Sequence, residues 1–225
     1  MNKTILKAFV GLLFLIVVMG IVLFSAVGTL HYRAGWVYLS VFFLCCAAIT
    51  GYLVKKDMEL LKRRLSAGPA GEKEKSQKII QSIAQLAFIA IYVVAGLDRR
   101  CSWSLLPKYL YIIGDAVVLV GFYIVFKTFA VNTFTAANIQ VAKAQTVITT
   151  GPYAIVRHPM YSGALLLLLG TPVALNSWWA LLSVLPMFVV IIARLMDEER
   201  FLKKNLSGYT DYCLKVKWRL LPGVF

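Results

Sequence analysis

Five long runs with almost no charged residue constrain this chain more than any other feature. Four runs without any charge cover residues 8–30, 34–54, 79–97 and 161–193, and a fifth, 109–126, is interrupted only by Asp115. Each run is long enough to cross a hydrocarbon core of roughly 30 Å as a helix of about 20 residues. Hydrophobic residues make up 60% of the chain and charged residues 15%, whereas a soluble domain carries nearer a quarter charged residues. We therefore predict an all-α, polytopic integral membrane protein and exclude a soluble domain.

The first apolar run follows Lys3 and Lys7, as the core of a signal peptide does. A signal core is only about 7–15 residues long, and this run is longer. We therefore interpret it as a retained span.

The net charge of +14 is explained by basic residues that lie beside the apolar runs. This distribution is typical of the positive-inside rule and of contact with anionic lipid headgroups, and no nucleic-acid motif is present. The histidines are His31 and His158, and no cysteine pair has the CxxC spacing. We expect no nucleic-acid partner, no metal site and no disulfide framework.

The run 161–193 allows two arrangements, one long bent helix or a helical hairpin. A single helix of this length measures about 50 Å, well beyond the hydrocarbon core. Pro172, followed by Asn176 and Ser177, offers a break and a turn, so a hairpin has arms at 162–175 and 178–193.

The distribution of Lys and Arg favours the hairpin. With a cytoplasmic N-terminus, the hairpin places 20 basic residues inside and 4 outside, whereas a single span gives 13 and 11. The first split obeys the positive-inside rule far better. We predict four transmembrane helices plus a C-terminal helical hairpin, with both termini cytoplasmic.

The segment 55–78 is basic and has a glycine- and proline-containing centre at 68–71. It predicts a polar loop with a short amphipathic helix at the membrane surface. Such a segment either contacts substrate and lipid or is simply solvated, and the second interpretation is favoured.

The chain shows no internal repeat and is interpreted as one domain, 1–225, with N-terminal spans in 1–108 and a motif-rich core in 109–225.

In that core, Pro159 fits the first turn of a helix, whose free N–H groups form a natural anion site. Arg157 and His158 add donors beside it, or else anchor the helix end in the headgroups.

Two further polar clusters follow. Arg194 and Glu198 are four residues apart and therefore share a helix face. They either form a paired binding site, or Arg194 is a snorkelling anchor at the end of the span and the acidic residues are a solvated helix end. The second cluster is the C-terminal tail, residues 207–225. It either forms an interfacial belt or closes a pocket, through Tyr209, Tyr212, Trp218 and Arg219. Asp115 is expected to be structural, with Lys108 as a partner.

Three stretches carry a resemblance to a known family: TVITTGPYAIVRHPMYSG, the Arg194 and Glu198 pair with its acidic run, and GYTDYCLKVKWRLLPGVF. With KDMELLKRRL and AGLDRR, they resemble the bacterial members of the isoprenylcysteine carboxyl methyltransferase family. The RHPxY element alone is less specific, because membrane sterol reductases and phospholipid methyltransferases carry similar C-terminal regions.

The resemblance implies S-adenosylmethionine as cofactor, held in a cytoplasmic cofactor-binding region, and assigns residues to it. Arg194 matches the arginine that binds the substrate carboxylate, and Gln145 departs from the histidine of eukaryotic members. The implied cofactor residues are Gln140, Gln145, Thr146, Val147, Ile148, Tyr153, His158, Pro159, Met160, Tyr161 and Glu198.

The activity implied is methyl transfer to a lipophilic small-molecule or lipidated substrate, with a carboxylate such as that of an isoprenylcysteine as the leading acceptor. A lipid amine or thiol is an alternative acceptor. A sterol-type NADPH reductase and a non-enzymatic membrane scaffold are the alternatives from other classes. Membrane lipids are the expected surroundings in every case.

Overall fold

The computed structural model describes residues 3–65, 75–107, 109–135 and 145–225, and these residues contain helices and no strand. The chain order is α1 (Lys3–Val27), α2 (Arg33–Lys56), α3 (Met58–Leu65), α4 (Lys75–Cys101), α5 (Leu110–Val131), the 3-10 turn η2 (Gly151–Ala154), α6 (Pro159–Ala174), α7 (Trp179–Leu182), α8 (Val184–Asn205) and α9 (Tyr209–Lys215).

Five segments of the described chain are long and apolar enough to cross a membrane. They correspond to α1, α2, α4, α5 and the combined α7 and α8, while α6 is a shorter apolar helix. The prediction of an all-α, multi-pass membrane protein is confirmed.

The predicted hairpin is also confirmed, with two adjustments. Pro172 lies inside α6 and does not end it; the helix continues for two more residues, and the turn follows at 175–178. Asn176 has a φ of 51°, a left-handed conformation that asparagine tolerates better than most residues. The returning arm extends beyond residue 193 to Asn205, so the polar residues after the apolar run belong to the same helix.

Polar contacts hold the hairpin turn against the end of α4. The carboxylate of Asp98, which is only 1% exposed, accepts hydrogen bonds of 2.6 Å from both the backbone N–H and the hydroxyl of Ser104. The Ser177 hydroxyl also donates to Asp98, and the Tyr32 hydroxyl donates to the carbonyl of Leu175. These bonds fix the turn, and with it the direction in which α8 returns.

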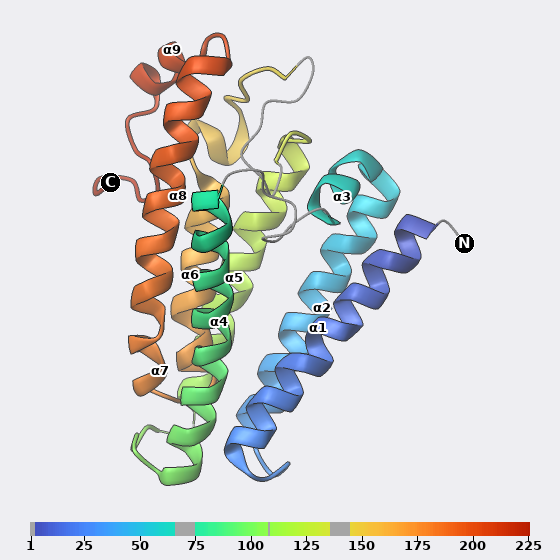
Figure 1. Ribbon diagram of the computed structural model, residues 1–225, viewed down its shortest axis with the longest axis vertical. Helices are drawn as coiled ribbons and strands as arrows, with labels where there is room; N and C mark the ends of the chain where they lie inside the picture. Colours follow the sequence, from blue (N-terminus) through green and yellow to red (C-terminus); the bar gives the residue numbers. More distant parts are fainter. Residues whose placement is uncertain (1–2, 66–74, 108, 136–144) are drawn as a thin grey trace.

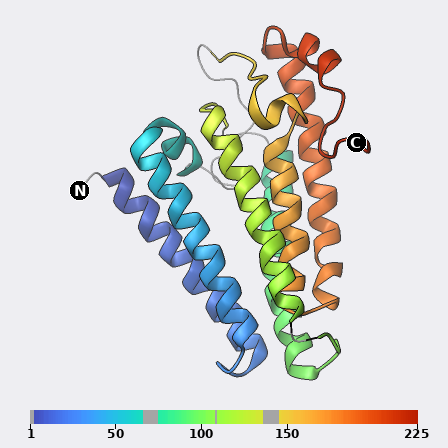
Figure 2. The same cartoon turned by 180° about the vertical axis from the view of Figure 1, so that it is seen from behind.

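Helices α5 and α6 lie side by side in both views (Figures 1 and 2), and glycines allow their backbones to approach closely. A Cβ added at Gly114 would lie 2.0 Å from the Ala174 backbone nitrogen, and one added at Gly121 would lie 2.9 Å from the Gly163 carbonyl oxygen. Small residues are typical of transmembrane helix interfaces, where close packing is the main source of attraction.

We expect Gly114→Ala to force α5 and α6 apart and to lower the free energy of unfolding by about 1–3 kcal/mol or more, the usual cost of overpacking. Gly51→Ala in α2 is the matched control, because a Cβ there meets nothing within 4 Å. Thermal unfolding in detergent measures both. A melting temperature for the Gly114 variant no lower than that of the control contradicts this account of the interface.

Helices α1 and α2 form an inclined pair beside the other spans (Figure 1), and α3 follows α2 at the upper end of that view. The interpretation of 55–78 as a solvated loop is wrong for the stretch that forms α3, since Leu60 and Leu61 there are buried. The predicted short amphipathic helix is present, and its apolar face packs against α1, α2 and α5.

The start of α1, α3, the end of α5, the start of α6 and the end of α8 share the upper end of the molecule in Figures 1 and 2. The turns at 28–32, 102–107 and 175–178 lie at the opposite end. Asp115 is near that opposite end and is 6% exposed; its carboxylate has no hydrogen-bond partner among the described residues. Its expected partner, Lys108, lies outside the described residues.

Candidate active site

A pocket opens at the upper end of the bundle, between the end of α5, the segment 145–161, α8 and α9. The chain regions that form it are far apart in sequence and are brought together by the hairpin. Its wall consists of Asn132, Phe134, Thr135, Gln145, Thr146, Val147, Ile148, Tyr153, Arg157, His158, Met160, Tyr161, Arg194, Glu198, Leu202, Leu206, Tyr209 and Tyr212.

Most residues that the sequence pointed to lie on this wall: Gln145, Thr146, Val147, Ile148, Tyr153, His158, Met160, Tyr161, Arg194 and Glu198. Pro159 does not; it is fully buried at the first position of α6, where its missing N–H costs no hydrogen bond. Gln140 lies outside the described residues. The structure therefore brings together the two clusters that were separate in sequence.

Tyr161 connects the pair on α8. Its hydroxyl donates a hydrogen bond of 2.8 Å to Oε2 of Glu198, and Arg194 also interacts with this hydroxyl. The two α8 residues are one turn apart, so they present a carboxylate and a guanidinium to neighbouring parts of one pocket.

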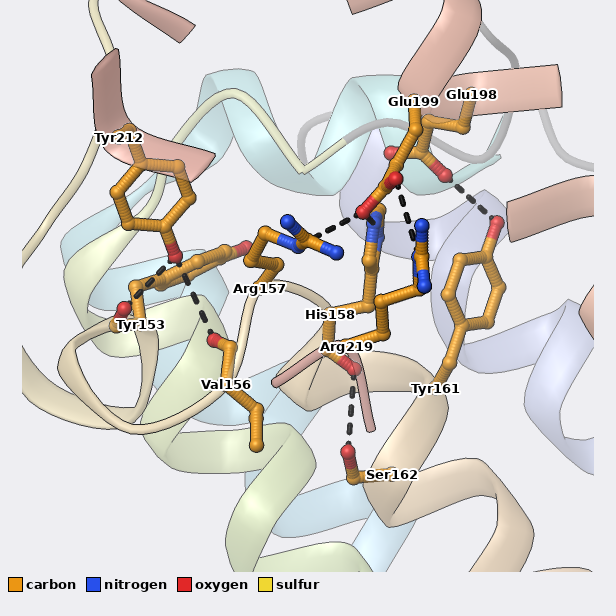
Figure 3. A network of polar contacts seen from close by, with 10 residues as sticks. All are labelled: Tyr153, Val156, Arg157, His158, Tyr161, Ser162, Glu198, Glu199, Tyr212 and Arg219. Carbon is orange, nitrogen blue, oxygen red and sulfur yellow. Dashed lines mark hydrogen bonds and ion pairs between the residues drawn. The ribbon is translucent and has the colours of Figure 1, made fainter. Parts of the chain in front are cut away.

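Glu199, to which the sequence analysis assigns no role, is the centre of a buried ion network (Figure 3). It is 3% exposed, and its Oε1 lies 2.8 Å from Nε of Arg157 and 3.3 Å from Nε2 of His158. Its Oε2 lies 3.2 Å from Nε of Arg219. The carboxylate thus joins α8 to the start of α6 and to the tail. Arg157 and His158 are therefore engaged in holding the site together, and Glu199 is not available as a free base.

Backbone contacts of the tail reinforce this network. The N–H groups of Arg157 and His158 donate to the carbonyls of Trp218 and Arg219, each at 2.9 Å. The Ser162 hydroxyl donates to the carbonyl of Leu220 at 2.6 Å. The tail therefore runs along the start of α6, as the pocket-closing interpretation requires, and is not simply an interfacial belt.

Two tyrosines fix the far wall of the pocket. The Tyr212 hydroxyl donates to the carbonyl of Tyr153 at 2.7 Å, and the Tyr153 hydroxyl accepts a hydrogen bond of 2.8 Å from Asn132. Burial raises the pKa of both hydroxyls, so both stay protonated at neutral pH. These bonds tie the end of α5, η2 and α9 into one rigid wall.

Residues 109–208 match the sequence model of the phospholipid methyltransferase family. This stretch is 100 of the 225 residues, and over it the chain is similar to membrane methyltransferases. The family resemblance drawn from the motifs is confirmed at this level. The matched region runs from the start of α5 past the end of α8 to Gly208, just before α9, and includes the pocket wall except Tyr209 and Tyr212. A search of curated proteins found no match to the chain.

The pocket has features that fit a nucleoside with charged groups. The Tyr209 hydroxyl is buried on the wall and has no hydrogen-bond partner among the described residues, although buried polar groups are nearly always paired. The start of α6 has no side-chain cap, so its first-turn N–H groups suit an anion. Val147, Leu202 and Leu206 add an apolar surface that suits an aromatic base.

Proposed function

We propose that this protein is a methyltransferase that uses S-adenosylmethionine and transfers its methyl group to an oxyanion of a lipophilic acceptor, with a carboxylate of the isoprenylcysteine type as the leading candidate. The observation that carries the proposal is the placement of Glu198 and Arg194 on either side of the Tyr161 hydroxyl in one pocket. One carboxylate and one guanidinium suit two ligands of opposite charge.

When bound, S-adenosylmethionine supplies an electrophilic methyl carbon on a sulfonium, which an in-line displacement transfers while the carbon–sulfur bond breaks to leave a thioether. The carboxylate of Glu198 suits the amino or ribose groups of this cofactor, and the first-turn N–H groups of α6 suit its carboxylate. The unpaired Tyr209 hydroxyl provides one more donor or acceptor. The contribution of these residues is mainly alignment, as in other reactions between bound partners.

On the acceptor side, Arg194 binds and orients the acceptor carboxylate, because a guanidinium matches the fork of a carboxylate. Such an acceptor is already ionised at neutral pH and needs no general base. His158 and Glu199 are held in the buried network, which supports an anionic acceptor over an amine or thiol. A neutral methyl ester no longer attracts Arg194, which favours release of the product.

A lipid amine is the second candidate acceptor, supported by the name of the family that matches residues 109–208. In that case Arg194 faces the phosphate beside the amine. An NADPH-dependent reductase and a non-enzymatic scaffold have no comparable support, because the matched family consists of methyltransferases.

We also propose that the end carrying the pocket faces the cytoplasm, with both termini on that side. The support is the excess of Lys and Arg that the sequence predicts on the side of the two termini, 20 against 4 on the other side. Cysteine labelling with an impermeant reagent at Lys3→Cys, compared with Thr29→Cys, tests this orientation in intact cells. Labelling of the Lys3 position from outside contradicts it.

The acceptor is tested by incubating the purified protein with methyl-labelled S-adenosylmethionine and amphiphiles that differ only in carrying a carboxylate, an amine or a thiol. We expect label in the carboxylate, in a form that alkali releases as methanol. Alkali-stable label in the amine supports the second candidate. Label in none of the three, under conditions in which the cofactor binds, contradicts the proposed acceptor class.

A further inference from the structure

The hydroxyl group of Tyr209 is buried in the pocket wall without a hydrogen-bond partner among the described residues. The side chain as a whole is 4% exposed. Burial without a partner is costly for a hydroxyl, and folded proteins nearly always avoid it. Because this hydroxyl belongs to a residue that lines a cavity, a ligand in that cavity is within its reach.

The backbone and the packing hold Tyr209 in this place. Gly208, directly before α9, has a φ of 79°, a left-handed conformation that glycine adopts without steric cost. The Tyr209 N–H donates to the carbonyl of Leu206 at 3.2 Å, and the centroid of its ring lies 5.8 Å from that of Tyr212. A packed ring cannot swing its hydroxyl to a different partner, so the unpaired hydroxyl follows from the fold.

The neighbouring tyrosine on α9 shows what a structural hydroxyl does in this region. Tyr212 donates its hydroxyl hydrogen to the carbonyl of Tyr153 at 2.7 Å and so fastens α9 to η2 (Figure 3). The carbonyls of Trp218 and Arg219 hold the rest of the tail against the start of α6. These bonds secure the tail without any contribution from the Tyr209 hydroxyl.

Tyr209 stands in the apolar part of the pocket. It belongs to a cluster of packed side chains whose members on the pocket wall are Val147, Tyr153, Leu202, Leu206, Tyr209 and Tyr212. The charged residues of the wall, Arg194 and Glu198, meet instead at the Tyr161 hydroxyl, outside this cluster. The pocket therefore combines a charged part with an apolar part that contains a free hydroxyl.

We propose that the apolar part of the pocket holds the nucleoside of the cofactor and that the Tyr209 hydroxyl forms a hydrogen bond with this nucleoside. A flat heteroaromatic base suits a surface of aliphatic and aromatic side chains, and a few placed polar groups then fix its orientation. The inference rests on the proposed function for the identity of the cofactor as S-adenosylmethionine, but not for the binding of a nucleoside.

The protonation state of Tyr209 suits this role. Burial raises the pKa of its hydroxyl, so the group stays protonated at neutral pH and can donate to a ring nitrogen or to a ribose oxygen. Tyr209 also follows directly on the region 109–208 that matches the family. The tail thus supplies a ligand contact from outside the matched region, in addition to closing the pocket.

Three substitutions of tyrosine by phenylalanine test the proposal, because each removes one hydroxyl and leaves the ring. Tyr209→Phe removes the unpaired hydroxyl, and Tyr212→Phe removes a bonded one as the comparison for stability. Tyr123→Phe is the control for ligand binding, since Tyr123 is 61% exposed on α5 and does not line the pocket. The melting temperature without ligand is measured in detergent, and calorimetric titration gives the affinities for S-adenosylhomocysteine and adenosine.

We expect Tyr209→Phe to affect stability and binding in opposite ways. Its melting temperature without ligand is expected to equal or exceed that of the unmodified protein, because a buried group without a partner is removed, whereas Tyr212→Phe melts at a lower temperature. Its affinities for S-adenosylhomocysteine and for adenosine are expected to fall by the same factor, roughly threefold to tenfold, as the loss of one hydrogen bond predicts. Tyr123→Phe is expected to bind both ligands as the unmodified protein does.

A loss of adenosine affinity below about threefold in Tyr209→Phe overturns the proposal, and it is the result expected if the hydroxyl binds only a water molecule. A loss seen with S-adenosylhomocysteine alone also overturns it, since the hydroxyl then contacts the amino-acid part. A Tyr209→Phe variant that melts lower, or does not fold, shows that the hydroxyl is paired within the protein and overturns the premise. Failure of the proposed function shows separately, as adenosine binding without binding of S-adenosylmethionine in the unmodified protein.

Discussion

Glu199→Ala is expected to lower the free energy of unfolding by roughly 3–5 kcal/mol, the cost of breaking a buried ion pair by removing one partner. The carboxylate is the shared counter-charge of Arg157 and Arg219 and also contacts His158, and Arg157 is itself only 8% exposed. Without it, a buried guanidinium is left without compensation, and the contact between α8, the start of α6 and the tail is lost. Denaturant or thermal unfolding in detergent measures the loss.

Asp197→Ala is the matched control for Glu199→Ala. Asp197 lies two residues away on α8 and forms an ion pair of 3.4 Å with the exposed Arg200. Exposed pairs contribute about 0–1 kcal/mol, so this variant is expected to stay close to the unmodified protein. Equal stability of the two variants would mean that Glu199 is not the centre of the fold at this end.

Glu198→Ala is expected to weaken binding of S-adenosylmethionine on the order of tenfold to a hundredfold, as removal of a hydrogen bond to a charged group does. Because Glu198 is only half-buried, the melting temperature without ligand is expected to change little. For the neighbouring variant, Glu199→Ala, the loss of folding stability is expected to be the larger effect. Calorimetric titration with the cofactor measures the affinity of each variant.

Arg194→Ala complements this variant on the opposite side of Tyr161. It is expected to bind the cofactor normally and to lose methyl transfer to a carboxylate acceptor. If both Glu198→Ala and Arg194→Ala bind the cofactor and turn over normally, the assignment of the two α8 residues is wrong.

The arrangement of spans was predictable from the sequence because the bilayer imposes a simple rule on it. Uncharged runs of sufficient length form spanning helices, and the charge distribution resolved the hairpin. Pro172 was harder to interpret, because a proline inside an apolar run indicates a kink, a break or a tolerated position equally well. Its neighbours decide the outcome, here through the bonds of Ser177 and Leu175 at the turn.

The roles of Glu198 and Glu199 were not predictable from the sequence. Neighbouring residues on a helix point about 100° apart, so only the orientation of α8 in the bundle determines which acid faces the pocket and which faces the tail. The short helix α3 posed a similar problem, because an amphipathic helix has the same sequence pattern whether its apolar face meets lipid or protein. Buried Leu60 and Leu61, and the contact of Arg64 with Met160, show that here it meets protein.

The central claim is that the pocket between α5, α6, α8 and α9 binds S-adenosylmethionine. The most direct measurement is the thermal stability of the purified protein with S-adenosylmethionine, its demethylated product and NADPH. A ligand at a hundred times its dissociation constant stabilises by about 2.7 kcal/mol, which is readily detected. We expect the first two ligands to raise the melting temperature of the unmodified protein, to do so much less in Glu198→Ala, and NADPH to have no effect. No shift with either of the first two, or a shift with NADPH alone, would contradict the claim.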